Sequence, residues 1–354
     1  MNLRKIMHKL HLWLALPSAI VLFIVCITGS IFTYADEIMD FMHRPYSEVA
    51  VGANKQPVES ILKTVRNRYP DDKIASMVAY TDKSKSYKIL LYSEKNGLRS
   101  VFADPYSGQI LGESRAHQFF YVVAHLHSEL LLGEPGAWIV KIATVIFLIL
   151  IITGIVLWWP KKLTRKNWKN FFAFNHKFKF KRIVYDHHRV LGMYAAGVLL
   201  LLALTGTIMA FKPIEKSLVK ALGGGRSEMK SRWAETETKA PLLSIIEKYS
   251  AVPGVEAMRI GLASRQENGI YKIAAGQEIG ILTYSGAVHF VDKVSGEELT
   301  DRKGGVNAEV ENMLMSLHSG KWLGWFGELL TFLSGIIGAY LIVTGVIIWL
   351  NRRF

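Results

Sequence analysis

The sequence predicts a membrane α-helical protein with four transmembrane helices in two repeats and two small α+β domains outside the membrane. The chain has 354 residues, of which 50% are hydrophobic, and the apolar residues gather in four stretches. Each stretch is close to the roughly 20 residues that an α-helix needs to cross a bilayer. The segments between them are long, polar and mixed in charge, which is typical of water-exposed domains.

An internal repeat relates the four stretches in pairs, because each has a histidine at its start and a Thr-Gly pair near its end. The four sets are His11 with Thr28-Gly29, His188 with Thr205-Gly206, His127 with Thr153-Gly154, and His318 with Thr344-Gly345. The first two sets are 177 residues apart (188 − 11 and 206 − 29), and the last two are 191 apart (318 − 127 and 345 − 154). We expect spans at about 12–34, 137–159, 190–211 and 325–350.

The repeat also sets the expected domain boundaries. We expect a first transmembrane helix in 1–36, a first outer domain in 37–124, an outer edge and second transmembrane helix in 125–160, a basic link in 161–187, a third transmembrane helix in 188–212, a second outer domain in 213–315, and an outer edge and fourth transmembrane helix in 316–354. The first apolar run is too long for a typical signal peptide, so we interpret it as an uncleaved anchor.

The placement of Lys and Arg predicts the topology. The net charge is +14, and basic residues cluster at the N-terminus, in the link and at Arg352-Arg353. The link 161–189 holds ten Lys or Arg residues against one acid, Asp186. Cytoplasmic loops carry such an excess, so we expect a multi-pass protein of a bacterial inner membrane with both termini cytoplasmic and both outer domains periplasmic. Basic residues beside apolar segments favour the lipid bilayer as partner and argue against nucleic acid.

An aromatic stretch lies among the lysines of the link. It consists of Trp168, Phe171, Phe172, Phe174, Phe178 and Phe180. Rings alternating with lysines predict a segment at the membrane interface; the alternative is a solvated basic linker.

The two outer segments follow one pattern. Apolar residues at helical spacing predict helices at about 57–69 and 242–249, and alternating runs predict strands at 87–92, 98–102, 271–274 and 286–291. Asn96-Gly97 is a hairpin signal. Two Asp-x-x-Ser-Gly turns, at Asp104–Gly108 and Asp292–Gly296, are related by 188 residues, with the aspartate as a local cap and the glycine at positive φ.

The paired histidines predict haem ligands. His11 and His188 both lie near the cytoplasmic ends of their spans, whereas His127 and His318 both lie near the outer ends, so each pair shares a depth. A bis-histidine haem needs two neutral imidazoles from different helices facing each other across the iron. The single cysteine, Cys26, and the absence of Cys-x-x-Cys-His exclude covalently attached haem. Hydrated interfacial histidines are the alternative.

The Thr-Gly pairs are expected beside these histidine levels. Gly29 lies 18 residues after His11, or about 27 Å along a helix, which places it near the outer level. The candidates for packing against a flat porphyrin are Thr28, Gly29, Gly154, Gly206 and Gly345. Close helix–helix packing through small residues explains the same pattern equally well.

Seven further histidines have no histidine at the matching repeat position. His8, His125 and His187 adjoin the favoured ligands and are second-choice ligands. The remaining four, His43, His117, His176 and His289, are expected at the surface.

The order of these features resembles the PepSY-associated transmembrane family. The resemblance rests on an apolar span from His11 to Thr28-Gly29, a helix–hairpin domain ending in Asp-x-x-Ser-Gly, Leu126-His127-Ser128, and a span ending in Thr-Gly-x-x-x-Trp-x-Pro, and it covers essentially the whole chain twice. That family includes inner-membrane ferric-siderophore reductases with two b-type haems. The resemblance therefore implies two non-covalent b-type haems and an oxidoreductase that passes single electrons to a ferric siderophore on the periplasmic side.

Several functional alternatives are consistent with the sequence. The electron donor is either a cytoplasmic reductase or a membrane quinol. Four aromatic residues near the outer histidine level, Tyr121, Trp138, Trp322 and Trp325, form either an interface belt or part of a dock for the chelate. The alternative function is a non-catalytic membrane anchor that displays two PepSY-like domains for peptide binding or protease inhibition. A metal transporter is disfavoured because the spans lack deep carboxylates.

Overall fold

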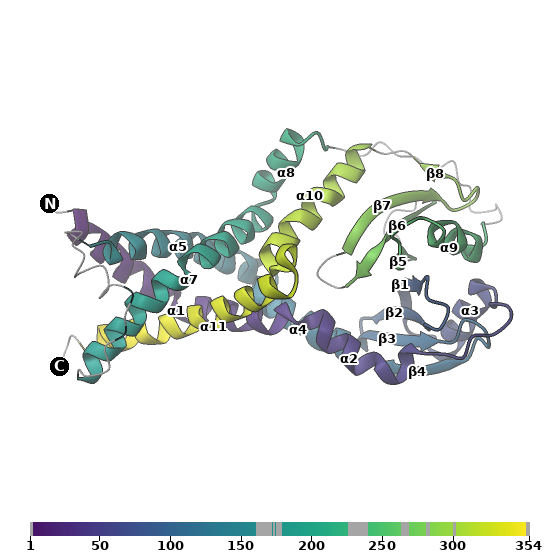
Figure 1. The fold of residues 1–354 in the computed structure, drawn as a ribbon, viewed down its shortest axis with the longest axis horizontal. Coiled ribbons are helices and arrows are strands. Elements are labelled where there is room, and N and C mark those ends of the chain that lie inside the picture. The colour runs from purple at the N-terminus through teal and green to yellow at the C-terminus, as the bar shows by residue number, and fades with distance from the viewer. Residues whose placement is uncertain are drawn as a thin grey trace. The chain divides into compact units, whose positions relative to one another are not determined.

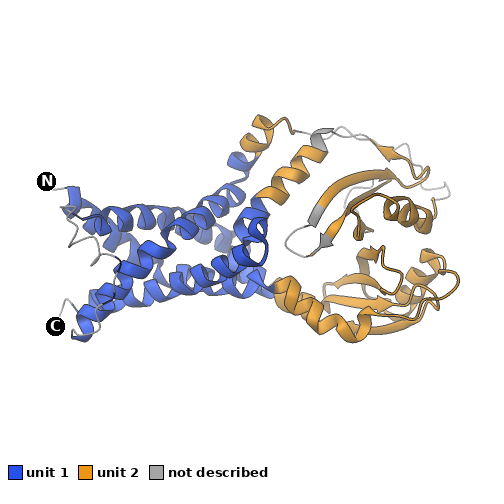
Figure 2. Cartoon of the chain, viewed as in Figure 1, with its two compact units in different colours: residues 1–34, 122–215, 314–354 blue, residues 35–121, 216–313 orange. Residues whose placement is uncertain are grey.

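The computed structural model describes residues 3–160, 172, 174, 179–225, 240–262, 269–280, 284–299 and 302–351. The chain divides into two compact units (Figure 2). Unit 1 comprises Met1–Tyr34, Val122–Glu215 and Leu314–Phe354, and unit 2 comprises Ala35–Tyr121 and Lys216–Met313. The basic link and its predicted interfacial segment lie mostly outside the described residues.

Unit 1 is built on four long apolar helices (Figure 1). They are α1 (Leu3–Thr33), α5 (Glu134–Trp158), α7 (Phe180–Ala210) and α11 (Gly324–Leu350). Within the described residues, four helical segments are long and apolar enough to cross a membrane, which agrees with the four predicted spans. Helix α1 packs against α5 and α11, and α7 packs against the same two.

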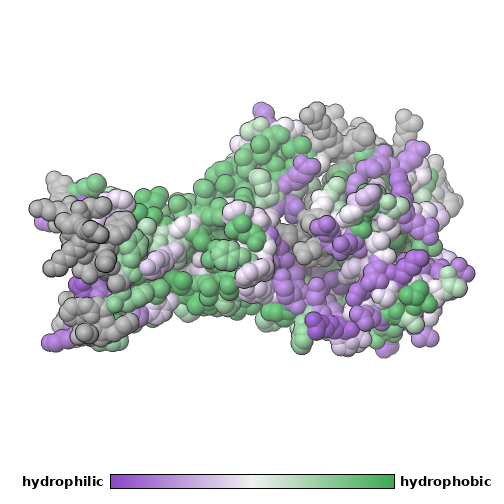
Figure 3. Space-filling view, in the orientation of Figure 1, coloured by the Kyte–Doolittle hydropathy of each residue, from purple (hydrophilic) through white to green (hydrophobic). Residues whose placement is uncertain are grey.

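Small residues bring α1 and α11 close together. A Cβ atom on Gly335 would lie 2.2 Å from Ser30 Oγ, and one on Gly338 would lie 2.9 Å from Cys26 Sγ. Ser30 Oγ donates a hydrogen bond to the carbonyl of Phe332 at 3.1 Å. On the face seen in Figure 3, apolar residues cover the middle of unit 1, and Trp13 and Trp325 are both 74% exposed. A helical bundle with this surface suits a lipid environment.

The helix boundaries change the expected positions of the histidines. Helix α1 begins at Leu3 and α7 at Phe180, so His11 and His188 lie two turns inside their helices. His127 and His318 end separate helices, α4 (Ala116–Glu129) and α10 (Arg302–Ser319), which precede the spans. A short irregular segment follows α4, and the 3₁₀ turn η1 (Lys321–Leu323) follows α10. Neither α4 nor α10 was predicted as a separate helix.

Unit 2 contains one antiparallel sheet in the order β4-β3-β2-β1-β5-β6-β7-β8. The strands are β1 (Lys73–Tyr80), β2 (Tyr87–Ser93), β3 (Gly97–Ala103), β4 (Ile110–Ser114), β5 (Ala257–Gly261), β6 (Ile270–Ile279), β7 (Tyr284–Asp292) and β8 (Glu298–Leu299). Two separate small domains were expected, but β1 pairs with β5 and joins the strands of both outer segments into one sheet.

One face of this sheet carries the apolar core. It packs against α3 (Val58–Arg68) and α9 (Leu242–Ser250), the two helices predicted from their spacing (Figure 1). Inward residues such as Ile89 and Met258 are fully buried there. Further short helices, α2 (Ala35–Ser47) and α8 (Lys212–Ala221), were not predicted.

Both Asp-x-x-Ser-Gly turns form as predicted. Asp104 Oδ1 accepts a hydrogen bond from the Tyr106 amide at 2.8 Å, and Gly108 has φ +72°. Asp292 Oδ1 accepts from the amides of Val294 and Ser295 at 2.8 and 3.0 Å, and Gly296 has φ +71°. The predicted glycine of the β2–β3 hairpin, Gly97, also has a positive φ of 68°.

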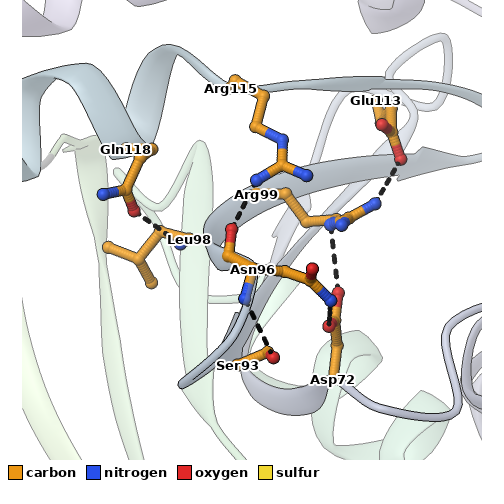
Figure 4. Close-up of polar contacts among 8 residues, drawn as sticks. All are labelled: Asp72, Ser93, Asn96, Leu98, Arg99, Glu113, Arg115 and Gln118. Carbon is orange, nitrogen blue, oxygen red and sulfur yellow. Dashed lines mark hydrogen bonds and ion pairs between the residues drawn. The ribbon is translucent and has the colours of Figure 1, made fainter.

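A buried ion pair stabilises the β2–β3 hairpin (Figure 4). Arg99 Nε lies 3.0 Å from Asp72 Oδ2, and Arg99 Nη1 lies 2.9 Å from Glu113 Oε2. Asn96 Nδ2 donates to Asp72 Oδ1 at 3.1 Å, which ties the hairpin turn to the same carboxylate. Arg99 therefore connects the start of β1, its own strand β3 and the edge strand β4.

Candidate functional site

The predicted histidine pairs face each other within unit 1. The ring centroids of His11 on α1 and His188 on α7 are 6.4 Å apart, with an interplanar angle of 87°. Those of His127 on α4 and His318 on α10 are 6.2 Å apart, with an angle of 66°. The repeat register thus selects the same two pairs that the geometry brings together.

A threonine hydroxyl on a neighbouring helix lies beside each of the four histidines. The four Nδ1-to-Oγ1 distances are 2.8 Å for His11 and Thr153, 3.0 Å for His188 and Thr344, 3.2 Å for His127 and Thr28, and 2.9 Å for His318 and Thr205. Every one of these threonines belongs to a Thr-Gly pair of the sequence repeat. Each Thr-Gly pair therefore supports the histidine of a different helix at the same level.

The hydrogen bonds of these threonines fix which imidazole nitrogen carries the proton. Each Oγ1 donates its one hydrogen to the carbonyl four residues earlier, at 2.6 to 2.9 Å. It can therefore only accept from the histidine, so Nδ1 is protonated. For His127 the Val25 carbonyl, an acceptor only, also lies 3.0 Å from Nδ1. The other ring nitrogen, Nε2, is left with a free lone pair, as a metal-binding imidazole requires.

The glycine of each pair gives the imidazole room. A Cβ atom on Gly29 would lie 3.0 Å from His127 Cε1, and one on Gly206 would lie 3.1 Å from His318 Cε1. For Gly345 and Gly154 the distances to the partner histidines are 3.4 and 3.6 Å. The nearest neighbour of these glycines is thus an imidazole ring, and their packing against a macrocycle stays a prediction.

The spacing of the rings fits a single metal ion between two imidazoles. Two metal–imidazole bonds of about 2 Å each, together with the two ring radii, give a centroid separation of roughly 6 Å. The separations of 6.4 and 6.2 Å agree with this sum. Within the described residues there is no group of three or more His, Cys, Asp or Glu side chains placed to hold a metal ion. A two-ligand site suits a metal whose remaining ligands come from a macrocycle, as in bis-histidine haem.

The second-choice histidines take other roles. His125 Nδ1 pairs with Glu129 one turn along α4, and His187 Nδ1 lies 2.9 Å from the Tyr340 hydroxyl. His8 lies close enough to His11 to act on its charge.

The expectation that four other histidines lie at the surface was wrong for His43. Its side chain is 3% exposed and stacks on Phe102, with ring centroids 4.8 Å apart. His117 is half-buried with Nδ1 3.2 Å from Ser100 Oγ, and His289 Nδ1 lies 2.7 Å from Glu298 Oε1. His176 lies outside the described residues. The burial of His43 was not predicted because its helix, α2, was not predicted.

The aromatic residues predicted near the outer level have exposed side chains. Tyr121 belongs to unit 2, and the others, Trp138, Trp322 and Trp325, belong to unit 1. Lys141 Nζ lies 4.7 Å from the Trp138 ring centroid. An exposed tryptophan beside a lysine on a span is typical of a membrane–water interface.

Sequence comparison assigns the chain to a family. No curated protein matches it at a significant level. The family described as the PepSY-associated TM region matches residues 8–352, which covers all four spans, both histidine pairs and the sheet unit. The chain is therefore a multi-pass membrane protein that belongs to the PepSY-associated transmembrane family.

Proposed function

We propose that this protein binds two b-type haems and transfers single electrons across a bacterial inner membrane to a ferric siderophore. The observation that carries the proposal is the double pair of facing histidines, each oriented by a threonine. A helical anchor has no need of four oriented imidazoles in two pairs, because ionisable groups between transmembrane helices are costly and usually functional.

The protein's own residues would supply binding and orientation. His11 and His188 would hold one haem, and His127 and His318 would hold the other. Each threonine hydroxyl would bind Nδ1 of its histidine and so leave Nε2 for the haem iron. Bound haem would supply reversible one-electron chemistry. Because the Nδ1–H groups donate to oxygen acceptors, the ligands become more basic, and a more basic ligand stabilises the ferric state.

The acceptor we propose is a ferric chelate at the outer face. Ferric iron is held tightly by hard oxygen ligands, and reduction to Fe(II) weakens that hold. One-electron transfer would release iron without breaking the chelator, so the enzyme, an oxidoreductase, would require no nucleophile. The donor would be a cytoplasmic reductase or a quinol.

The topology we propose follows from charge. The basic N-terminus, link and C-terminus would lie in the cytoplasm and unit 2 in the periplasm. His127 and His318 would then form the outer site and His11 and His188 the inner one.

An optical spectrum of the purified protein, with haem extracted by acidic solvent, tests the proposal. We expect close to two non-covalent haems with a six-coordinate low-spin spectrum. His11→Ala and His188→Ala should each remove the inner haem alone, and His127→Ala and His318→Ala the outer one alone. A colourless protein after expression with ample haem would refute the proposal and favour a non-catalytic anchor.

A further inference from the structure

Two short junctions join the histidine-bearing helices to the spans that follow them. The first joins α4 to α5 over residues 130–133, and the second joins α10 to α11 over residues 320–323. Both junctions lie within unit 1. His127 and His318 each lie in the last turn of the helix that ends at its junction. The backbone of the junction therefore sets where each of these imidazoles lies.

A backbone carbonyl at or just past the end of each histidine helix packs against a glycine of the next span. A Cβ atom on Gly136 of α5 would lie 1.8 Å from the Glu129 carbonyl oxygen. One on Gly327 of α11 would lie 2.0 Å from the Gly320 carbonyl oxygen. Because Cβ atoms do not approach other heavy atoms more closely than about 3.0 Å, only glycine fits at these two positions.

The second copy of the repeat keeps this junction at the same register. The stretches 129–136 and 320–327 are 191 residues apart (320 − 129), as His127 and His318 are, and they share a residue type at only three of their eight positions. The shared pairs are Leu132 with Leu323, Gly133 with Gly324, and Gly136 with Gly327. The two leucine amides donate to the two carbonyls at 2.9 and 3.1 Å, and the first glycine of each copy has a positive φ, +63° and +59°. The positions that the copies share are therefore the ones that shape the junction.

The first junction also carries backbone strain. Leu130 and Leu131 have φ of 54° and 58°, in the left-handed region that a leucine rarely adopts. The Leu131 side chain is 53% exposed, so its contacts within the protein offset little of this strain. Such a conformation persists only where the surrounding structure holds the backbone. The contact of Glu129 with Gly136, directly beside these leucines, supplies that hold.

We propose that Gly136 and Gly327 are positioning residues for His127 and His318, the outer haem ligands of the proposed function, on which this inference rests. Each imidazole is held on one side by a threonine of α1 or α7, at 3.2 and 2.9 Å. The glycine contact holds the end of the same histidine helix against the following span, α5 or α11. Supports on two different helices fix both the direction of each ring and its distance from the opposite imidazole.

An alanine at either glycine would displace the packed carbonyl by about 1 Å. The distance must increase from 1.8 to 3.0 Å at Gly136 (3.0 − 1.8 = 1.2) and from 2.0 to 3.0 Å at Gly327 (3.0 − 2.0 = 1.0). A backbone carbonyl cannot swing aside as the tip of a flexible side chain can. A metal site tolerates deviations of roughly 0.2 Å in its bond lengths, so a shift of this size would take the histidine out of reach of the iron.

Haem retention in two single-haem backgrounds tests the proposal. By the proposed function, His11→Ala leaves only the outer haem and His127→Ala only the inner one. In the first background, Gly136→Ala or Gly327→Ala should speed the transfer of haem to excess apomyoglobin roughly tenfold or more. In the second background, the same substitutions should leave haem transfer unchanged. Gly197→Ala is the matched control, because a Cβ atom at this position of α7 has no neighbour within 4 Å.

Spectra with and without free imidazole separate a displaced ligand from a general loss of structure. In the His11→Ala background, Gly136→Ala should give a high-spin spectrum that added imidazole returns to low spin, because imidazole fills the position that His127 leaves. An outer haem as stable as in the parent, loss of haem or of folded protein in both backgrounds alike, or a high-spin spectrum that imidazole does not change would each overturn the proposal.

The two backgrounds also separate this inference from the proposed function. If neither background holds haem, the proposed function fails and this inference fails with it. If both hold haem and the glycine variants match their parents, this inference alone fails.

Discussion

At the scale of single residues, the four threonines beside the paired histidines are the strongest reason to regard these histidines as candidate ligands. An imidazole between helices can point either nitrogen towards a neighbour. Here each Nδ1–H is committed to an oxygen on another helix, so the choice is made before any ligand binds. Such supporting hydrogen bonds typically change metal affinity by 10- to 100-fold.

Thr153→Val is predicted to weaken the inner haem site. Valine keeps the shape of threonine but cannot accept the proton of His11 Nδ1. We expect roughly tenfold weaker haem retention at that site and a higher midpoint potential, since the ligand becomes less basic. Redox titration followed at the haem absorption band measures both. Thr207→Val is the control, because that hydroxyl also bonds a carbonyl in its own helix, and an equal effect there would exclude a specific role for Thr153.

At the scale of elements, the apolar spans and the turns could be predicted, and the strand pairing between the outer segments could not. Span prediction needs only length and hydropathy, and an Asp-x-x-Ser-Gly turn is a local signal. The pairing of β1 with β5 joins residues far apart in the chain, such as Val78 and Arg259 (259 − 78 = 181), and no local pattern encodes it. The helices α2, α4, α8 and α10 were not predicted.

The same limits apply to the candidate site. The histidine pairs were predictable because a duplicated chain repeats them at constant spacing. The hydrogen bonds that Thr153 and Thr344 make with the histidines were not predictable, because they depend on the rotation of α5 and α11 about their axes. The burial of His43 depends on an unpredicted helix packing against a sheet.

The hairpin ion pair leads to a prediction about stability. Asp72 is 2% and Arg99 11% exposed in their side chains, so removing one partner leaves a buried charge uncompensated. Arg99→Ala should therefore destabilise unit 2 by about 3 kcal/mol. The double variant Arg99→Met with Asp72→Asn should recover part of that loss. Chemical denaturation measures the difference, and equal stability of the wild type and Arg99→Ala would contradict the role of this pair.

The buried histidines of unit 2 predict a pH dependence. Burial and the charge of Lys88 lower the pKa of His43 to about 4, and burial with Lys88, Arg259 and His43 lowers that of His117 to about 3. The unfolded chain, with histidine near 6.5, binds more protons between these values. The stability of unit 2 should therefore be complete above about pH 6.5 and decrease as the pH falls towards 4.

Hydrogen exchange of α2 and β2 measures this loss. The double variant His43→Leu with His117→Gln should show a weaker dependence in that range. The variant His289→Gln should retain the wild-type dependence, because the imidazole of His289 contacts Glu298 and Tyr249 and, within the described residues, neither His43 nor His117. Identical pH profiles for the wild type and the double variant would exclude these two histidines as the cause.

At the scale of the whole molecule, the proposed function gives a reason for two histidine pairs at different expected depths, because electrons would pass between the two faces of the membrane. The pairs are contributed by different helices, α1 with α7 and α4 with α10, so a substitution can remove one proposed haem site and leave the other. Lys/Arg placement predicts which pair lies nearer the cytoplasm. The direction of electron transfer can therefore be tested with the protein inserted in a single orientation in vesicles.

Chemically reduced protein in oriented vesicles should be reoxidised by a ferric siderophore added to the periplasmic face alone. Loss of His127 or His318 should stop this reaction, since both are predicted to hold the outer haem. Loss of His11 should slow turnover fed from the cytoplasmic side, yet leave oxidation of a pre-reduced outer haem nearly unchanged. Stopped-flow absorbance of the haem bands separates the two steps. Oxidation from the cytoplasmic face only would reverse the assignment of the two pairs, because the exit site must be the one that the acceptor can reach.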